Sequence, residues 1–113
     1  MNVTTSHVGN AVVLRVQDSR LTYPILSDFA TTAANLIASG EKRIVVDLEP
    51  VSYVDSATIG CLMDLYRQAS AVGGSVKLSH VQKRVETMLT MTGAQNFLEV
   101  HADEASALAS FGA

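Results

Sequence analysis

The residues best suited to chemistry lie in one short segment, 55–60, which reads Asp-Ser-Ala-Thr-Ile-Gly. The segment lies between a buried-strand pattern and a helix pattern, so Ser56 falls where the helix should begin. We expect Ser56 to be the N-cap, accepting hydrogen bonds from the first free backbone N–H groups while its side chain stays at the surface. A kinase can reach such a hydroxyl. A serine that only caps the helix would show the same local pattern.

An enzymatic site has little support elsewhere in the chain. Ser56 and Asp55 need a histidine nearby for nucleophilic catalysis, but no spacing ties His7, His80 or His101 to them. The sequence also lacks a Gly-x-Ser-x-Gly elbow, a P-loop and a Gly-x-Gly-x-x-Gly run. We therefore expect no catalytic residues, no cofactor and no metal site.

Composition favours a protein partner. The 113 residues, 48% hydrophobic, fit one domain, 1–113, with a single core. The net charge is −3 and the eight Lys and Arg residues do not cluster, which argues against nucleic acid. We find no signal-peptide pattern and no apolar run that could cross a bilayer, so we expect no membrane insertion. The lone Cys61 suits a reducing cytoplasm.

Hydrophobic periodicity alternates between two and about 3.6 residues, which is typical of an α/β domain. We expect a mixed, mostly parallel sheet of about five strands with about four helices and an N-terminal hairpin around Gly9-Asn10. The predicted strands are Asn2–Val8, Ala11–Val16, Arg43–Leu48, Ser75–Ser79 and Asn96–Val100. The predicted helices run from Pro24 to Gly40, from Ala57 to Val72, from Val81 to Thr92, and onward from a cap at Asp103.

The helix after Ser56 has two unlike faces. Apolar residues at three- and four-residue steps predict the core face: Ile59, Leu62, Met63, Tyr66 and Ala69. The other face has mostly small or polar residues: Ala57, Gly60, Cys61, Asp64 and Gln68. Small side chains let a partner's backbone approach closely, although a solvated helix face would look similar.

The segment 55–60, together with the strand before it and the helix after it, resembles the STAS family, specifically bacterial anti-sigma factor antagonists. Members carry Asp-Ser-Ser/Thr-Gly-Leu-Gly after a valine-rich strand, and Asp55, Ser56 and Gly60 match that pattern. Residues 85–93 look like the family's penultimate helix, which ends in Thr-Gly or Ser-Gly, and residues 97–100 fit its closing strand. The resemblance covers nearly the whole chain as a single STAS domain.

The resemblance implies partner switching. The unmodified protein is expected to bind an anti-sigma factor that is also a serine kinase, and so to free a sigma factor. Phosphorylation of Ser56 abolishes that binding in this scheme, and a serine phosphatase resets the switch. We expect the partner-binding surface to consist of Asp55, Ser56, Ala57, Thr58, Gly60, Cys61 and Asp64.

Two departures from the family pattern open alternatives. Ala57 and Thr58 stand where Ser/Thr and Gly are usual, and Asp-Ser-Arg-Leu at 18–21 replaces Gly-Glu-Leu-Asp. We expect the bulkier Thr58 either to hinder the kinase or to become an alternative acceptor. A divergent member could instead serve a histidine-kinase pathway, a secretion-system regulator, a signalling scaffold or a ligand sensor, with Ser56 only a helix cap.

Overall fold

The apolar strands of this chain pair into one five-stranded sheet in the computed structural model, which describes residues 3–111 and only the backbone of 23–25. The strand order is β1-β2-β4-β6-β7, where the strands are β1 (Val3–Val8), β2 (Ala11–Val16), β4 (Arg43–Asp47), β6 (Ser75–Ser79) and β7 (Glu99–His101). β1 is antiparallel to β2, with Val3 opposite Val16, and all other neighbours are parallel. The predicted hairpin and mostly parallel sheet are confirmed.

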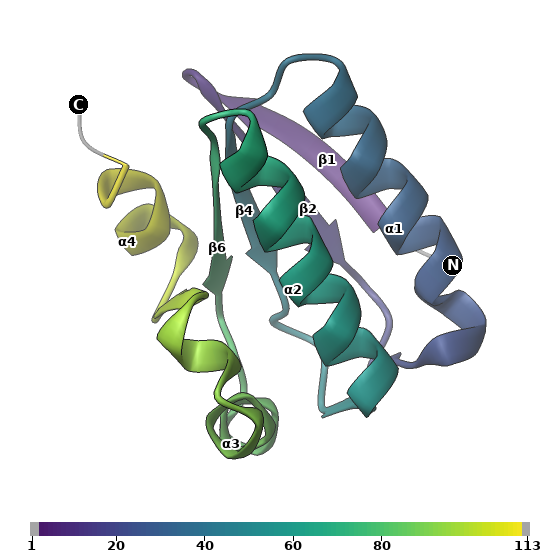
Figure 1. Ribbon diagram of the computed structural model, residues 1–113. Helices are drawn as coiled ribbons and strands as arrows, with labels where there is room; N and C mark the ends of the chain where they lie inside the picture. Colours follow the sequence, from purple (N-terminus) through teal and green to yellow (C-terminus); the bar gives the residue numbers. More distant parts are fainter. Residues whose placement is uncertain (1–2, 112–113) are drawn as a thin grey trace.

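Helices cover the two faces of this sheet unequally. The long helices α1 (Tyr23–Ala38) and α2 (Ser56–Ala71) lie side by side on one face, while the short α4 (Glu104–Ala109) lies on the other (Figure 1). Helix α3 (Lys83–Thr92) lies at the end of the sheet where α2 begins (Figure 1). No described helix is long and apolar enough to span a membrane.

The central strands are buried on both faces, as the continuous apolar run Ile44-Val45-Val46 predicts. All three of these residues are fully buried. Ile44 and Val46 pack into the main core under α1 and α2, whereas Val45 packs with Val13 and Ala107 beneath α4. Residues 43, 45 and 47 of β4 therefore face α4, because side chains alternate along a strand.

Two features differ from the sequence prediction. The strand expected from Asn96 begins only at Glu99, because Ala94–Asn96 form a 3₁₀ turn and the N–H groups of Phe97 and Leu98 donate to the Ala94 carbonyl. A second sheet, consisting of the two-residue parallel strands β3 (Arg20–Leu21) and β5 (Tyr53–Val54), was not expected. Both strands are too short for a periodicity signal.

Other boundaries lie close to those expected. Helix α3 begins at Lys83 rather than Val81, and it ends at Gly93, whose φ of 78° is left-handed. The predicted cap Asp103 accepts a hydrogen bond from the Ser106 N–H at 2.7 Å. Asn2, included in the first predicted strand, and residues 1–2 and 112–113 of the predicted domain lie outside the described residues.

Candidate functional site

Helix α2 begins one residue earlier than expected. Its N-cap is Asp55, whose extended backbone (φ −105°, ψ 178°) precedes the helix and whose Oδ1 accepts from the Thr58 N–H at 2.9 Å. The prediction that Ser56 is the N-cap is therefore wrong, because aspartate serves as well as serine in that position. Ser56 is instead the first helical residue, and its side chain is exposed.

Thr58 is turned into the protein rather than toward a partner. Its side chain is fully buried, and Oγ1 lies 2.5 Å from the Leu21 carbonyl oxygen and 2.8 Å from Asp55 Oδ1. The single hydroxyl proton is thus shared between two acceptors. This burial argues against both expectations for Thr58, that it is an alternative phosphate acceptor and that it is part of the contact surface.

The short second sheet explains why Thr58 fits there. Leu21 pairs with Val54 in register, which places the Leu21 carbonyl beside the first turn of α2. Ser52 also joins the segments that contain β3 and β5, because its N–H donates to the Ser19 carbonyl at 2.8 Å. The two segments that depart from the expected family pattern therefore contact each other: Leu21 of the segment 18–21 accepts a hydrogen bond from Thr58, where a glycine was expected.

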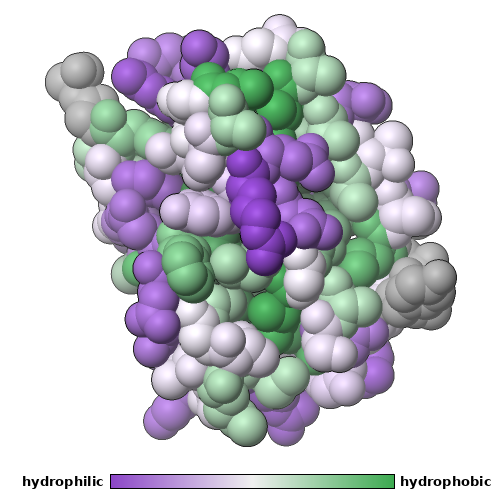
Figure 2. All heavy atoms as spheres, in the orientation of Figure 1, coloured by the Kyte–Doolittle hydropathy of each residue, from purple (hydrophilic) through white to green (hydrophobic). Residues whose placement is uncertain are grey.

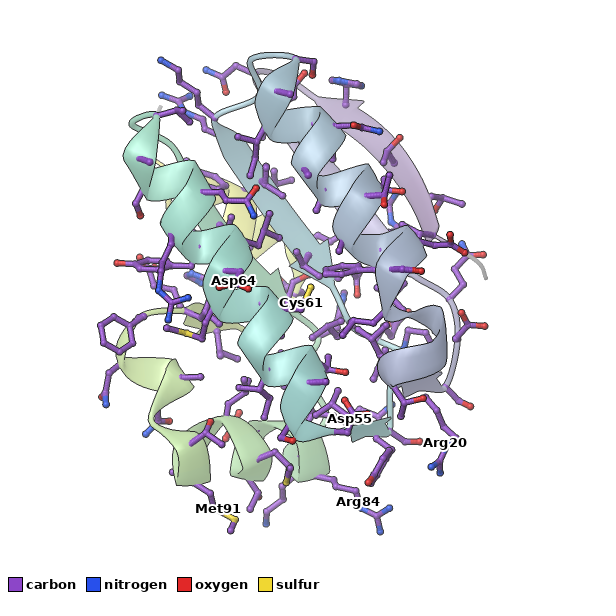
Figure 3. All side chains as sticks on the ribbon, turned by 45° about the vertical axis from the view of Figure 1, so that its right-hand side comes forward. Arg20, Asp55, Cys61, Asp64, Arg84 and Met91 are labelled. Atoms are coloured by element: carbon purple, nitrogen blue, oxygen red, sulfur yellow. The ribbon has the colours of Figure 1, made fainter. Side chains whose placement is uncertain are left out.

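A groove runs between α1 and α2 beside Ser56. It has a volume of about 410 Å³, and its walls include Phe29, Ala30 and Ala33 of α1. The small and polar face predicted for α2 forms the other wall: Ala57, Gly60, Cys61, Asp64 and Gln68. In Figure 3, Cys61 points toward α1 while Asp64 lies further along α2. The sequence therefore grouped these five residues correctly.

The opposite face of α2 packs into the core, as predicted. Ile59, Leu62 and Ala69 are buried, and Met63 and Tyr66 are partly buried against the core. Leu65, which was not among the predicted core residues, is also buried, and it lies between the groove and the core.

The thiol in the groove is poorly suited to nucleophilic chemistry. Cys61 is a free, half-buried cysteine. Burial raises the pKa of its thiol, and the nearby Asp64 carboxylate raises that pKa further. Since the thiolate is the reactive form, the neutral thiol acts as a small side chain in the groove wall.

Positive and apolar side chains surround the Ser56 end. Arg20, Arg84 and Met91 lie at the same end of the molecule as Asp55 (Figure 3). The Arg20 guanidinium stacks 4.4 Å from the centre of the Tyr53 ring, and the Met91 side chain is 77% exposed. The sequence alone assigned no role to Arg20, Tyr53, Arg84 or Met91, because only the fold brings them to this end of the molecule.

The middle of α2 is hydrophilic on its outer side (Figure 2), where Asp64 and Arg67 form an ion pair of 2.7 Å.

A second polar cluster lies where α4 meets the sheet. Asp47, His80 and Glu104 place ligand-type atoms within 4.8 Å of one another. Arg15 is opposite Asp47 in register, and its guanidinium holds both Glu104 oxygens at 2.7 and 3.0 Å. Burial raises the pKa of Asp47, while the hydrogen bonds from Arg15 lower that of Glu104. Both Glu104 carboxylate oxygens already accept hydrogen bonds from Arg15 of β2. The cluster therefore joins α4 to the sheet.

Comparison with known proteins agrees with this architecture. The model of the STAS domain family matches residues 2–107, so the chain belongs to the STAS domain family. The anti-sigma-B factor antagonist of Bacillus subtilis (strain 168) is 29% identical over 55 residues, which is 49% of this chain and only 50% of that protein. The matched segment therefore spans about half the length of this curated relative.

Solved structures share the fold at low sequence identity. A STAS domain protein from Planctomyces limnophilus has a TM-score of 0.87 and 18% identity, with 97% of each chain covered. An anti-sigma factor antagonist from Mycobacterium paratuberculosis has a TM-score of 0.88 and 13% identity, covering 96% of this chain and 92% of that one. The phosphorylated form of the Bacillus cell fate determinant SpoIIAA has a TM-score of 0.75 and 20% identity, covering 97% of this chain and 99% of that one.

Proposed function

We propose that this STAS domain is an anti-sigma factor antagonist whose partner binding is controlled by phosphorylation of Ser56. The proposal rests on the different roles of three neighbouring residues at the start of α2. Asp55 caps the helix and Thr58 is buried, so the exposed Ser56 hydroxyl has no structural task among the described residues. A kinase can therefore modify it without breaking a contact.

Relatives of this fold support the proposal. SpoIIAA, a Bacillus anti-sigma factor antagonist of the same fold, has been solved in phosphorylated and unphosphorylated forms. Applied to this chain, the unmodified protein binds an anti-sigma factor with serine kinase activity. The phosphorylated protein releases that partner until a serine phosphatase removes the group.

The fold should tolerate the phosphate. A phosphoserine carries about −1.5 to −2 charges, and the N-terminus of a helix favours such a charge by roughly 0.3 to 1 kcal/mol. The Asp55 carboxylate, one residue away, opposes it. These two local effects are small and of opposite sign, so we expect the modified domain to stay folded.

The effect on binding should be much larger. Burying the phosphate against a partner without a matching cation costs several kcal/mol. A penalty of about 3 kcal/mol weakens binding roughly a hundredfold. The switch therefore operates at the interface and leaves the fold of the domain intact.

The contact surface in this proposal is the exposed side of the first turns of α2 and the adjoining groove. Asp55, Ser56, Ala57, Gly60, Cys61 and Asp64 form it, and Thr58 holds it from beneath. A groove of about 410 Å³ with walls of alanine, glycine and phenylalanine suits an apolar side chain of the partner.

The acceptor assignment is tested by intact-mass analysis after incubation with the cognate anti-sigma kinase and ATP. We expect one added phosphate in the wild-type protein and none in Ser56→Ala. Ser70→Ala, which removes another exposed serine of the same helix, is the matched control and should still accept it. Equal phosphate uptake by Ser56→Ala would show the assignment to be wrong.

The switch is tested by calorimetry with the same kinase. The phosphorylated protein should bind at least a hundredfold more weakly than the unmodified one, while thermal melts of the two forms stay close. Ser56→Ala should bind like the unmodified protein, and Ser56→Asp should be only a partial mimic because a carboxylate carries less charge. Equal affinities would leave a constitutive binding or scaffold domain.

A further inference from the structure

We propose that the end of the molecule opposite Ser56 carries a binding site for the phosphate group of a small molecule. A cavity of about 370 Å³ opens there, between the starts of β4 and β6 and the end of α4. Three cationic side chains, two hydroxyls and one aromatic ring line it: Lys42, Arg43, Lys77, Ser75, Ser110 and Phe111.

The sheet register builds this site. Arg43 is opposite Ser75 at the first position of β4 and β6, and Lys77 lies two residues further along the same face. That face is the one covered by α4, whose six residues pack over Val13 and Val45 in the middle of the strands. The short helix leaves the beginning of the strands open, so Arg43 and Ser75 line a cavity instead of a core.

Lys77 places a positive charge deep in the cavity wall. Its side chain is only 9% exposed, and Nζ donates to the Ser110 hydroxyl and carbonyl at 2.7 and 3.1 Å. Nζ also lies 3.4 Å from Glu99 Oε1 and 4.6 Å from the centre of the Phe111 ring. These contacts use the three N–H donors of the Lys77 ammonium, so Lys77 fixes the end of α4 against the sheet and direct contacts to a ligand fall to Lys42 and Arg43.

The two outer cations are available to a ligand. Neither Lys42 nor Arg43 forms an ion pair or a side-chain hydrogen bond with another residue in the part of the chain described, 3–111. Glu41, the acidic neighbour in sequence, instead contacts His7 Nε2 at 3.1 Å. No acidic residue is among the described residues that line the cavity, and the Glu99 carboxylate beside it is paired with Lys77. The uncompensated positive charge at the cavity is therefore that of Lys42 and Arg43.

These donors match a phosphate ester. An arginine fork bonds two phosphate oxygens at once, and lysine adds a mobile point charge. The backbone N–H of Ser75 already donates to the Lys42 carbonyl at 2.7 Å, so recognition falls to side chains. The volume lies at the lower end of small-molecule sites, about 300 to 1,000 Å³, which indicates a small phosphate monoester.

The site is separate from the phosphorylation site. Helix α2 runs from Ser56 toward the turn at Gly73 that borders the cavity (Figure 1). Its 16 residues span about 24 Å at 1.5 Å per residue. A ligand there could not contact Ser56, so the two sites can be tested independently.

The test is a nuclear magnetic resonance titration with inorganic phosphate and then glycerol phosphate, against chloride at equal ionic strength. We expect saturable shifts at the amides of Lys42, Arg43, Ser75 and Lys77. Arg43→Ala and Lys42→Ala should each weaken binding about tenfold. Arg84→Ala, which removes an exposed arginine at the other end, is the matched control and should bind as the wild type does.

Three outcomes would overturn the proposal. The first is a shift that rises linearly with every salt, chloride included, because this shows only ionic screening. The second is full retention of binding in Arg43→Ala with its spectrum still folded. The third is binding to vesicles that contain phosphatidic acid with no response to either soluble phosphate, since the ligand would then be a lipid headgroup at a membrane surface.

Discussion

Asp55 and Thr58 hold each other at the start of α2: the Thr58 N–H and Oγ1 lie 2.9 and 2.8 Å from Asp55 Oδ1. Ser56 lies between these two residues in sequence, but its side chain takes no part in their hydrogen bonds. Asp55 thus supplies the cap and Thr58 anchors the turn to Leu21, while Ser56 and Ala57 between them stay exposed. The function proposed for Ser56 depends on this arrangement.

Removing the cap should cost stability. We expect Asp55→Ala to lower the free energy of unfolding by about 1 kcal/mol, because the Thr58 N–H loses its side-chain acceptor and keeps only the Asp55 carbonyl at 3.1 Å. Asp55→Asn keeps a capping oxygen without the charge and should stay within a few tenths of a kcal/mol of the wild type. Urea midpoints measure both. If Asp55→Asn is as unstable as Asp55→Ala, the carboxylate charge matters more than the cap.

The buried hydroxyl of Thr58 should matter more than its methyl group. Thr58→Val keeps the shape but leaves the Leu21 carbonyl without this donor, so we expect a loss of about 1 to 3 kcal/mol. Thr58→Ser retains the donor and should lose less. Chemical denaturation of the two variants checks the order, and a Thr58→Val protein as stable as the wild type would contradict it.

Two glycines should respond in opposite ways to alanine. A Cβ on Gly60 would meet no atom within 4 Å, so Gly60→Ala should stabilise α2 by up to about 1 kcal/mol. A Cβ on Gly74 would lie 2.7 Å from the Lys42 carbonyl oxygen, so Gly74→Ala should destabilise the fold. Thermal melts of this pair test the packing around both positions.

The same position offers a probe of the groove. We expect Gly60→Trp to weaken partner binding by filling the groove while the protein stays folded, because open space surrounds this position. Leu62→Ala, by contrast, creates a core cavity and should cost about 2 to 5 kcal/mol of stability. An unstable Gly60→Trp and a stable Leu62→Ala would mean that the two faces of α2 are assigned the wrong way round.

The contact between α4 and the sheet should depend on pH. Hydrogen bonds from Arg15 lower the pKa of Glu104, so the Glu104 charge stabilises the fold above its unfolded-state pKa. This contribution is lost as the pH falls through the lower, folded-state pKa. Glu104→Gln should therefore cost of order 1 kcal/mol at about pH 7, and its difference from the wild type should shrink as the pH falls.

Asp47 titrates with the opposite sign. Burial raises its pKa, so its contribution is greatest in acid and is lost as the pH rises through the folded-state pKa. The Glu104→Gln comparison should accordingly be repeated in an Asp47→Asn background, with urea midpoints at several pH values. A difference that stays constant with pH in both backgrounds would contradict an ionic role for Glu104.

The long, strongly patterned elements could be predicted from the sequence. Strand β6 has the expected bounds, 75–79, and the five small or polar residues of α2 do line one groove. These successes rest on periodicity, which is a local property. The N-cap was misplaced by one residue because Asp55 and Ser56 are equally good caps, and only the backbone conformation distinguishes them.

Relationships across the sheet could not be predicted in the same way. The approach of Leu21 to Thr58, and of Arg15 to Glu104, joins residues 37 and 89 positions apart. Both depend on strand register, which requires the whole sheet. The two residues of β3 carry no pattern at all, yet Leu21 supplies the carbonyl that accepts the hydrogen bond from Thr58.

The strand order also bears on how this chain resists aggregation. The apolar, uncharged run Ile44-Val45-Val46, of the kind that promotes aggregation when exposed, lies in the central strand. The two edges carry β1, whose Thr4, Thr5 and His7 side chains are exposed, and the three-residue β7, which begins with the acidic Glu99. Neither edge offers a long hydrophobic template to a second chain. Aggregation of this protein should therefore require unfolding first. The variants with a lower free energy of unfolding should precipitate at lower temperatures than the wild type.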